Sequence, residues 1–169
     1  MAVLILKFGA LVVSYEDKIK DQAQPYLLEG ERVLAAFIAR PKGAAMQNAV
    51  GGVVGNLVGG RKAVRQTRVA REAGLRLADP MALVLTSSRL LVLKISFPLA
   101  MGKGADVKEL ASEAPLSDVD SIEVKRLFAG KTVTVTVRGA AFMLEAGVGA
   151  DPQGLAREFD GIRAGSAAD

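Results

Sequence analysis

The 169-residue chain contains no cysteine, no histidine and no tryptophan. The absence of cysteine excludes disulfides, thiolate zinc sites and thiol nucleophiles. The absence of histidine removes the side chain that most often serves as a general base or a metal ligand near neutral pH. Carboxylates, lysine, tyrosine, serine and threonine remain for chemistry. We therefore expect a protein that is not an enzyme and that uses no cofactor.

Two short motifs resemble reactive sites but are incomplete. Asp118 and Asp120 form an Asp-x-Asp pair that no further cluster of ligands supports, so we interpret them as flanking a turn. The run 129–132 (AGKT) ends like a phosphate-binding loop, but Lys125 occupies the position of its first glycine. We predict no catalytic, cofactor-binding or metal-ligating residues and no small-molecule substrate.

Basic residues are concentrated in one segment. The chain holds 22 lysines and arginines against 18 aspartates and glutamates, a net charge of +4. Residues 61–76 hold six basic residues and one acidic residue, a net +5, which leaves 16 basic and 17 acidic residues elsewhere. The six are Arg61, Lys62, Arg65, Arg68, Arg71 and Arg76. Such a segment indicates an anionic partner or, alternatively, a solvated helix face.

The N-terminal residues 1–13 are apolar apart from Lys7, which interrupts the hydrophobic run. A secretory signal peptide carries its basic residues before that run, so we expect a buried strand or a short anchoring helix here. The lack of cysteine fits the cytosol. We expect a cytoplasmic protein, with peripheral attachment to the inner face of the membrane as the alternative location.

Hydrophobic stripes predict a helix near each end of the chain. A helix is expected over 14–28, broken by Pro25, and a second one after Asp151 as N-cap and Pro152 at its first position. The stripe residues expected to face the core are Tyr15, Ile19, Ala23 and Tyr26 in the first helix, and Leu155, Phe159 and Ile162 in the second.

Short hydrophobic runs between the helices predict strands. Val133, Val135 and Val137 alternate with threonines, so the valines should face the core. Strands are predicted over 32–40, 81–86, 89–97, 109–114, around 122–124, over 131–138 and over 142–145. Regularly spaced short strands indicate an antiparallel sandwich or a partly open barrel, with the last helix covering an open end.

Three of these segments resemble bacterial pleckstrin-homology-like (PH-like) domains: 29–34 (EGERVL), 83–93 (LVLTSSRLLVL) and 115–124 (PLSDVDSIEV). The resemblance covers about 27–40 and 81–164, and residues 15–18 with 25–27 are similar to the leader of some actinobacterial members. The family usually has two basic residues in the strand turn, where Ser88-Arg89 supplies one. The resemblance implies an α+β, mostly β fold, with a bent antiparallel sheet or partly open barrel of about seven strands and a C-terminal helix. It also implies a non-catalytic role in lipid, peptide or protein binding.

This layout divides the chain into an apolar segment 1–13, a helix 14–28, a single PH-like domain over 29–165 and a tail 166–169. Residues 41–80 form a long insertion between the first two strands of that domain, too long for a loop without structure of its own. Its first half, 43–60, is uncharged, and Gly51, Gly55 and Gly59 are spaced four apart. On a helix these glycines allow close approach of another backbone.

The second half of the insertion is the basic segment, which on a helix would carry Arg61, Arg65, Arg68 and Arg76 along one side. Three interpretations remain open for 41–80. The first interpretation is a membrane span, although the uncharged stretch of 18 residues with six glycines is short for one. The second is an interfacial or re-entrant segment whose basic residues bind anionic headgroups. The third is a helical hairpin or loop packed against the domain or a second copy.

The first functional hypothesis is therefore a non-enzymatic PH-like module that contacts a membrane surface or a protein partner through 41–80. The alternative is a structural subunit that uses the same segment as an assembly arm in a homo-oligomer or larger particle. Nucleic-acid binding by residues 61–76 ranks last, because no helix-turn-helix or comparable motif surrounds them.

Overall fold

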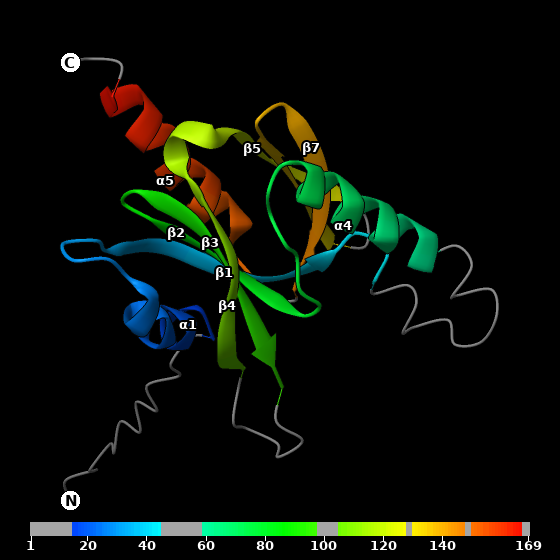
Figure 1. Cartoon of the computed structure of the whole chain (residues 1–169), viewed down its shortest axis with the longest axis horizontal. Helices are drawn as coiled ribbons and strands as arrows, with labels where there is room; N and C mark the ends of the chain where they lie inside the picture. Colours follow the sequence, from blue (N-terminus) through cyan, green and yellow to red (C-terminus); the bar gives the residue numbers. More distant parts are fainter. Residues whose placement is uncertain (1–14, 45–58, 98–104, 128–129, 148–149, 167–169) are drawn as a thin grey trace, which may run out of the picture.

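The computed structural model describes residues 15–44, 59–97, 105–127, 130–147 and 150–166 (Figure 1). Its elements are α1 (Tyr15–Ala23), η1 (Gln24–Tyr26), β1 (Val33–Pro41), α4 (Arg61–Glu72), β2 (Met81–Thr86), β3 (Arg89–Ser96), β4 (Asp106–Pro115), η3 (Leu116–Asp118), β5 (Val119–Leu127), β6 (Gly130–Val137), β7 (Ala140–Ala146) and α5 (Pro152–Ser166).

The seven strands form one antiparallel sheet in the order β4-β3-β2-β1-β7-β6-β5. β1 joins the two halves of this sheet. It pairs with β2 along most of its length, but with β7 only through Ala39–Pro41. The sheet bends at this short junction, and α5 packs against β1 and β5 (Figure 1). The predicted fold class is confirmed: a mostly β, bent antiparallel sheet of seven strands with a C-terminal helix.

The first half-sheet consists of β1 to β4. Both of its faces are buried, each in its own cluster of hydrophobic residues. Leu90 and Val92 of β3 belong to the main core, which also contains the inward valines of β6 and Phe159 of α5. Leu91, Leu93 and Ile95 face the other way, into a second cluster with Ile19 and Ala23 of α1. The prediction that the valines of β6 face the core is confirmed, because Val133, Val135 and Val137 are completely buried.

The two predicted terminal helices are present. In α5, Leu155 and Phe159 are buried, and the Asp151 carboxylate accepts a hydrogen bond from the Gly154 amide at 3.1 Å, as expected of an N-cap. α1 ends at Ala23, two residues before Pro25, in line with the predicted break. Tyr15 is a correction: its side chain is 57% exposed, because it lies in the first turn of α1, one turn before the first buried residue, Ile19.

The basic half of the long connection between β1 and β2 forms α4, which is one of the alternatives left open for this insertion, but the helix ends before Arg76. Gly74, at φ +83°, ends α4. Its amide bonds to the Arg71 carbonyl, and the next amide, that of Leu75, bonds to the Ala70 carbonyl. This is the glycine-terminated pattern common at helix ends. The prediction that Arg76 continues the basic side of the helix was therefore wrong.

A buried ion pair connects the turn before β1 to the turn between β2 and β3. The Glu31 and Arg89 side chains are 2% and 10% exposed. Glu31 accepts hydrogen bonds from the Arg89 guanidinium, from both Thr86 and Ser88 hydroxyls, and from the Leu28 amide at 2.9 Å.

Arg89 extends the same network to two further segments. Its Nη2 donates to the Tyr26 carbonyl of η1 at 3.1 Å, and its Nη1 donates to Glu113 near the end of β4. The Arg89 hydrogen bonds, opposed by burial and helped by the Leu28 amide and the two hydroxyls, hold the pKa of Glu31 far below its usual value of 4.5. Glu31 in turn raises the pKa of Arg89. Both carboxylate oxygens of Glu31 and four of the five N–H groups of the Arg89 guanidinium thus have partners.

We predict that Arg89→Met lowers the free energy of unfolding by about 3–5 kcal/mol, because it leaves the Glu31 carboxylate buried without its partner. Lys94→Met is the matched control: it breaks an exposed ion pair with Glu109 at 3.4 Å and should cost less than about 1 kcal/mol. Urea unfolding followed by circular dichroism measures both. Equal costs for the two variants would contradict the role given to Arg89.

The same pair predicts an acid-sensitive component of stability. Because the pKa of Glu31 is lower in the folded state than its unfolded value near 4.5, the unfolded chain takes up a proton first as the pH falls. The stabilisation is complete above that value and declines progressively below it. Glu31→Gln removes this component, so its stability deficit relative to wild type should shrink between pH 6 and pH 3. A constant deficit over that range would contradict the prediction.

Candidate functional site

α4 is attached to the point where β7 leaves β1. β1 and β7 pair only through Leu144–Ala146 of β7, so the backbone of the preceding residue, Met143, needs other partners. Its amide donates to the Gln66 side chain of α4 at 2.7 Å, and its carbonyl accepts from the Lys42 amide at 3.0 Å. On the same side, Ala70 of α4 is buried in the main core. These contacts orient the helix.

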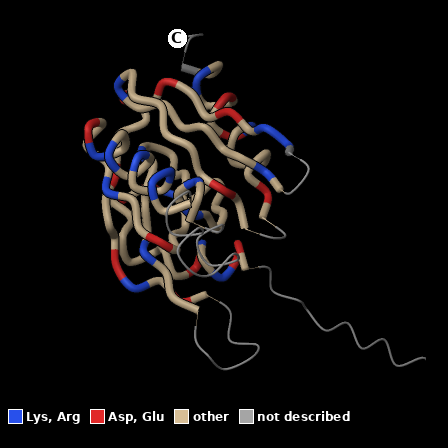
Figure 2. Tube along the Cα trace, turned by 90° about the vertical axis from the view of Figure 1, so that its right-hand side faces the viewer, with Lys and Arg blue, Asp and Glu red and all other residues tan. Residues whose placement is uncertain are grey.

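With Ala70 and Gln66 turned inward, the cations of α4 face solvent. We define the basic face of α4 as Arg61, Lys62, Arg65, Arg68 and Arg71, which are all exposed. In the part of the chain that the structure describes, none of the five forms an ion pair. Figure 2 views the molecule from the side on which α4 lies, with the lysines and arginines in blue.

Several arginines outside α4 have acidic partners. Arg40 lies 3.4 Å from Asp79, and Arg138 lies 2.6 Å from Asp118. Arg76, which the sequence grouped with the basic segment, is exposed but lies 3.8 Å from Glu109. The basic face therefore keeps its full charge, and the structure brings together five of the six predicted cations.

Two exposed hydrophobic side chains lie on α4 or next to it: Val64 belongs to the helix, and the Met143 backbone is bonded to Gln66 of the helix. Val64 is 63% exposed and stands three residues after Arg61 and four before Arg68, so it shares their side of the helix. Met143 is 39% exposed, and its sulfur lies 3.9 Å from the Lys42 ammonium. The surface thus combines unpaired positive charge with apolar area. The spacing of Val64 among the arginines was visible in the sequence, whereas the position of Met143 depends on the register of β7.

The glycine row can be followed only in part. Gly51 and Gly55 lie outside the described residues. Gly59 is buried, and its carbonyl oxygen lies 2.6 Å from where a Cβ of Gly43 would be. Gly43 itself has φ +100° and donates its amide to Glu145 of β7 at 3.2 Å. One glycine of the row therefore makes a close contact within the chain, at the start of α4. Whether the row contacts another chain stays a prediction.

The incomplete motifs have structural roles. Asp118, at the end of η3, accepts hydrogen bonds from the Arg138 guanidinium, and Asp120, in β5, accepts one from the Gly139 amide at 2.7 Å. The pair therefore braces the β6–β7 turn, about twenty residues further along the chain. Lys131 donates to the Ala150 carbonyl at 2.8 Å. Nowhere in the described ranges do three or more potential ligands gather into a group able to hold a metal ion. Among the helices described, none combines the length and hydrophobicity needed to cross a bilayer.

No protein-family model matches the sequence, and no curated protein matches it. Among solved structures, the chain is similar to a DUF1696 family protein with a pleckstrin-homology domain from Shewanella loihica PV-4. The TM-score is 0.41 at 14% identity, covering 86% of this chain and 94% of that chain. A pleckstrin homology domain from Shewanella amazonensis SB2B has the same TM-score and identity, over 84% and 82% of the two chains.

We predict that Gly43→Ala disturbs the seating of α4. Its new Cβ would lie 2.6 Å from the Gly59 oxygen and 2.8 Å from the Lys62 Cβ, at a φ that L side chains rarely adopt. Gly30→Ala is the control, because it has a similar positive φ of +76° but nothing within 4 Å. We expect Gly30→Ala to cost about 1 kcal/mol for strain alone and Gly43→Ala to cost about 2–3 kcal/mol.

Thermal unfolding compares the two variants, and limited trypsin digestion at the arginines of α4 reports its local opening. If both variants unfold alike and are cleaved at the same rate, the contact between Gly43 and Gly59 does not hold α4.

Proposed function

We propose that this chain is a PH-like binding module without catalytic activity, which docks on an anionic membrane surface through the basic face of α4. The observation that carries the proposal is five exposed cations on one 12-residue helix, unpaired within the described chain and accompanied by exposed Val64. The bent seven-stranded sheet with its C-terminal helix fits the fold that the sequence resemblance implies. The basic face of α4 is the surface through which we propose that this fold binds.

The energetics favour a lipid surface as the partner. Each basic residue near an anionic leaflet contributes about 1 kcal/mol, so five act together without a shaped pocket. An apolar side chain between them gains by entering the boundary of headgroups and acyl chains, as in interfacial helices. Val64 and Met143 are placed for this contact. A nucleic-acid backbone would use the same cations but offers little to the exposed valine.

The test is flotation of the full chain with vesicles of 70% phosphatidylcholine and 30% phosphatidylserine. We predict that charge reversal at Arg61, Arg65 and Arg68 weakens partitioning about 100-fold or more, because about 3 kcal/mol of attraction is lost. The control reverses the same number of charges elsewhere, at the exposed residues Lys108, Lys125 and Arg126, and should change partitioning much less.

Two further measurements separate the alternatives. Val64→Ser should weaken vesicle binding about three- to tenfold at unchanged salt dependence, but leave binding to duplex DNA unchanged. Sedimentation of the wild type without vesicles tests the assembly-arm alternative, which requires an oligomer at tens of micromolar. Equal vesicle partitioning by both triple variants would overturn the proposed function.

A further inference from the structure

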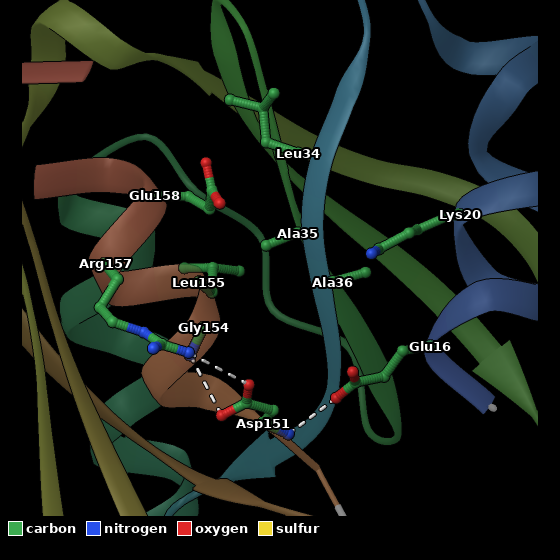
Figure 3. Close-up of a pocket in the computed structure, with 10 residues that line it drawn as sticks. All are labelled: Glu16, Lys20, Leu34, Ala35, Ala36, Asp151, Gly154, Leu155, Arg157 and Glu158. Atoms are coloured by element: carbon green, nitrogen blue, oxygen red, sulfur yellow. Dashed lines mark hydrogen bonds and ion pairs between the residues drawn. The ribbon is translucent and has the colours of Figure 1, made fainter. Parts of the chain in front are cut away.

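A second surface lies at the first half of β1. There, on the edge of β1 that pairs with β7 further along, the described part of the chain places no neighbouring strand. A cleft of about 200 Å³ opens there between α1, β1 and the first turns of α5 (Figure 3). Its floor includes Ala35 and Ala36 of β1 and Leu155 of α5, which are buried. Its rim carries charged side chains from both helices.

The hydrogen bonds of β1 show which way Ala36 faces. The Gly147 amide donates to the Ile38 carbonyl at 2.8 Å, on the side of β1 away from β2. Along a strand the backbone groups of successive residues alternate in direction, so those two residues apart share a side. Ala36 therefore directs its N–H and its C=O away from β2, toward the cleft. Pairing with β7 begins only at Ala39.

Within the described chain, no hydrogen bond reaches the Ala36 backbone from the cleft side. Ala36 is nevertheless only 3% exposed. Buried backbone donors and acceptors almost always have partners, ordered water included, so a chain that enters the cleft gains by supplying both in place of solvent. One donor and one acceptor on the same strand residue match an amide of a second extended chain, which is how peptides add to open sheet edges.

The rim charges restrict what that chain carries. Glu16 already accepts the Asp151 amide at 2.7 Å, and Asp151 caps α5 and lies 3.8 Å from Arg157. Lys20 of α1 and Glu158 of α5 differ: neither side chain forms an ion pair with any described residue. They come from opposite walls of the cleft, and Lys20 reaches toward β1 (Figure 3).

From this geometry we infer that the cleft binds an extended peptide segment of a partner protein, which adds to the edge of β1 at Ala36. The peptide places an acidic side chain near Lys20 and a basic side chain near Glu158. This binding is independent of the basic face of α4, so the failure of either proposal leaves the other standing. A short peptide making one amide pair and two rim contacts should bind with a dissociation constant of about 0.1–1 mM.

The first measurement is amide hydrogen exchange of the full chain. The Ala36 amide should exchange at least about tenfold faster than that of its neighbour Phe37, which faces β2. Equal protection of the two amides would mean that the edge is already covered by the chain itself or by a second copy, and would overturn the inference.

The second measurement is an NMR titration with two capped probes, Ac-Glu-Val-Thr-Val-Lys-NH2 and its reversed sequence, which sample both strand directions. We expect at least one probe to shift the Ala36 resonance and slow its exchange, and a version N-methylated at the central amides to bind at least tenfold more weakly. Lys20→Glu and Glu158→Lys should each weaken binding about three- to fivefold, whereas Lys125→Glu, outside the cleft, should not. No shift with either probe at 5 mM, or equal binding of the N-methylated version, would overturn the inference.

Discussion

The pair of Glu31 and Arg89 is the constraint on which the first half-sheet depends. It joins residues 58 positions apart in the chain, and through it the turn before β1, the β2–β3 turn, η1 and the end of β4 share one network. Two charges removed from water in this way stabilise a fold only when every lone pair and proton is satisfied. Here two hydroxyls, an amide, a carbonyl and the Glu113 carboxylate supply most of these partners, and the pairing register of β1, β2 and β3 brings them together.

The elements that follow from local pattern were predictable from the sequence. The valine–threonine alternation of β6 and the Asp-Pro start of α5 each depend on neighbours a few residues away, and both were confirmed. Tyr15 and Arg76 were assigned wrongly for a common reason: periodicity shows which side of a helix a residue occupies, but not where the helix ends or where its packing begins. Gly74 ends α4 before Arg76, and the contact of α1 with the sheet begins only at Ile19, after Tyr15.

The sequence predicted the positive charge of the candidate site, but not the contacts that hold α4 against the sheet. A count of arginines located the basic segment, and helical spacing placed Val64 among them. No sequence pattern indicated that Gln66 would serve the unpaired backbone of Met143, because that backbone is left free only by the short pairing of β7 with β1. The Ala36 cleft has the same origin. Both surfaces arise where β1 leaves one half-sheet for the other, a property of register that the sequence does not display.

The ends of the β1–β2 connection lie side by side, because Ala39 pairs with Met81 across the first hairpin of the sheet. The entropic cost of closing a loop grows only with the logarithm of its length, by about 0.6 kcal/mol for each doubling. The sheet is therefore nearly indifferent to how many residues the connection contains. Variation at the exposed positions of α4, unlike variation at the buried Ala70, can change what the surface binds without altering strand register. Recognition and folding are therefore free to diverge separately at those exposed positions.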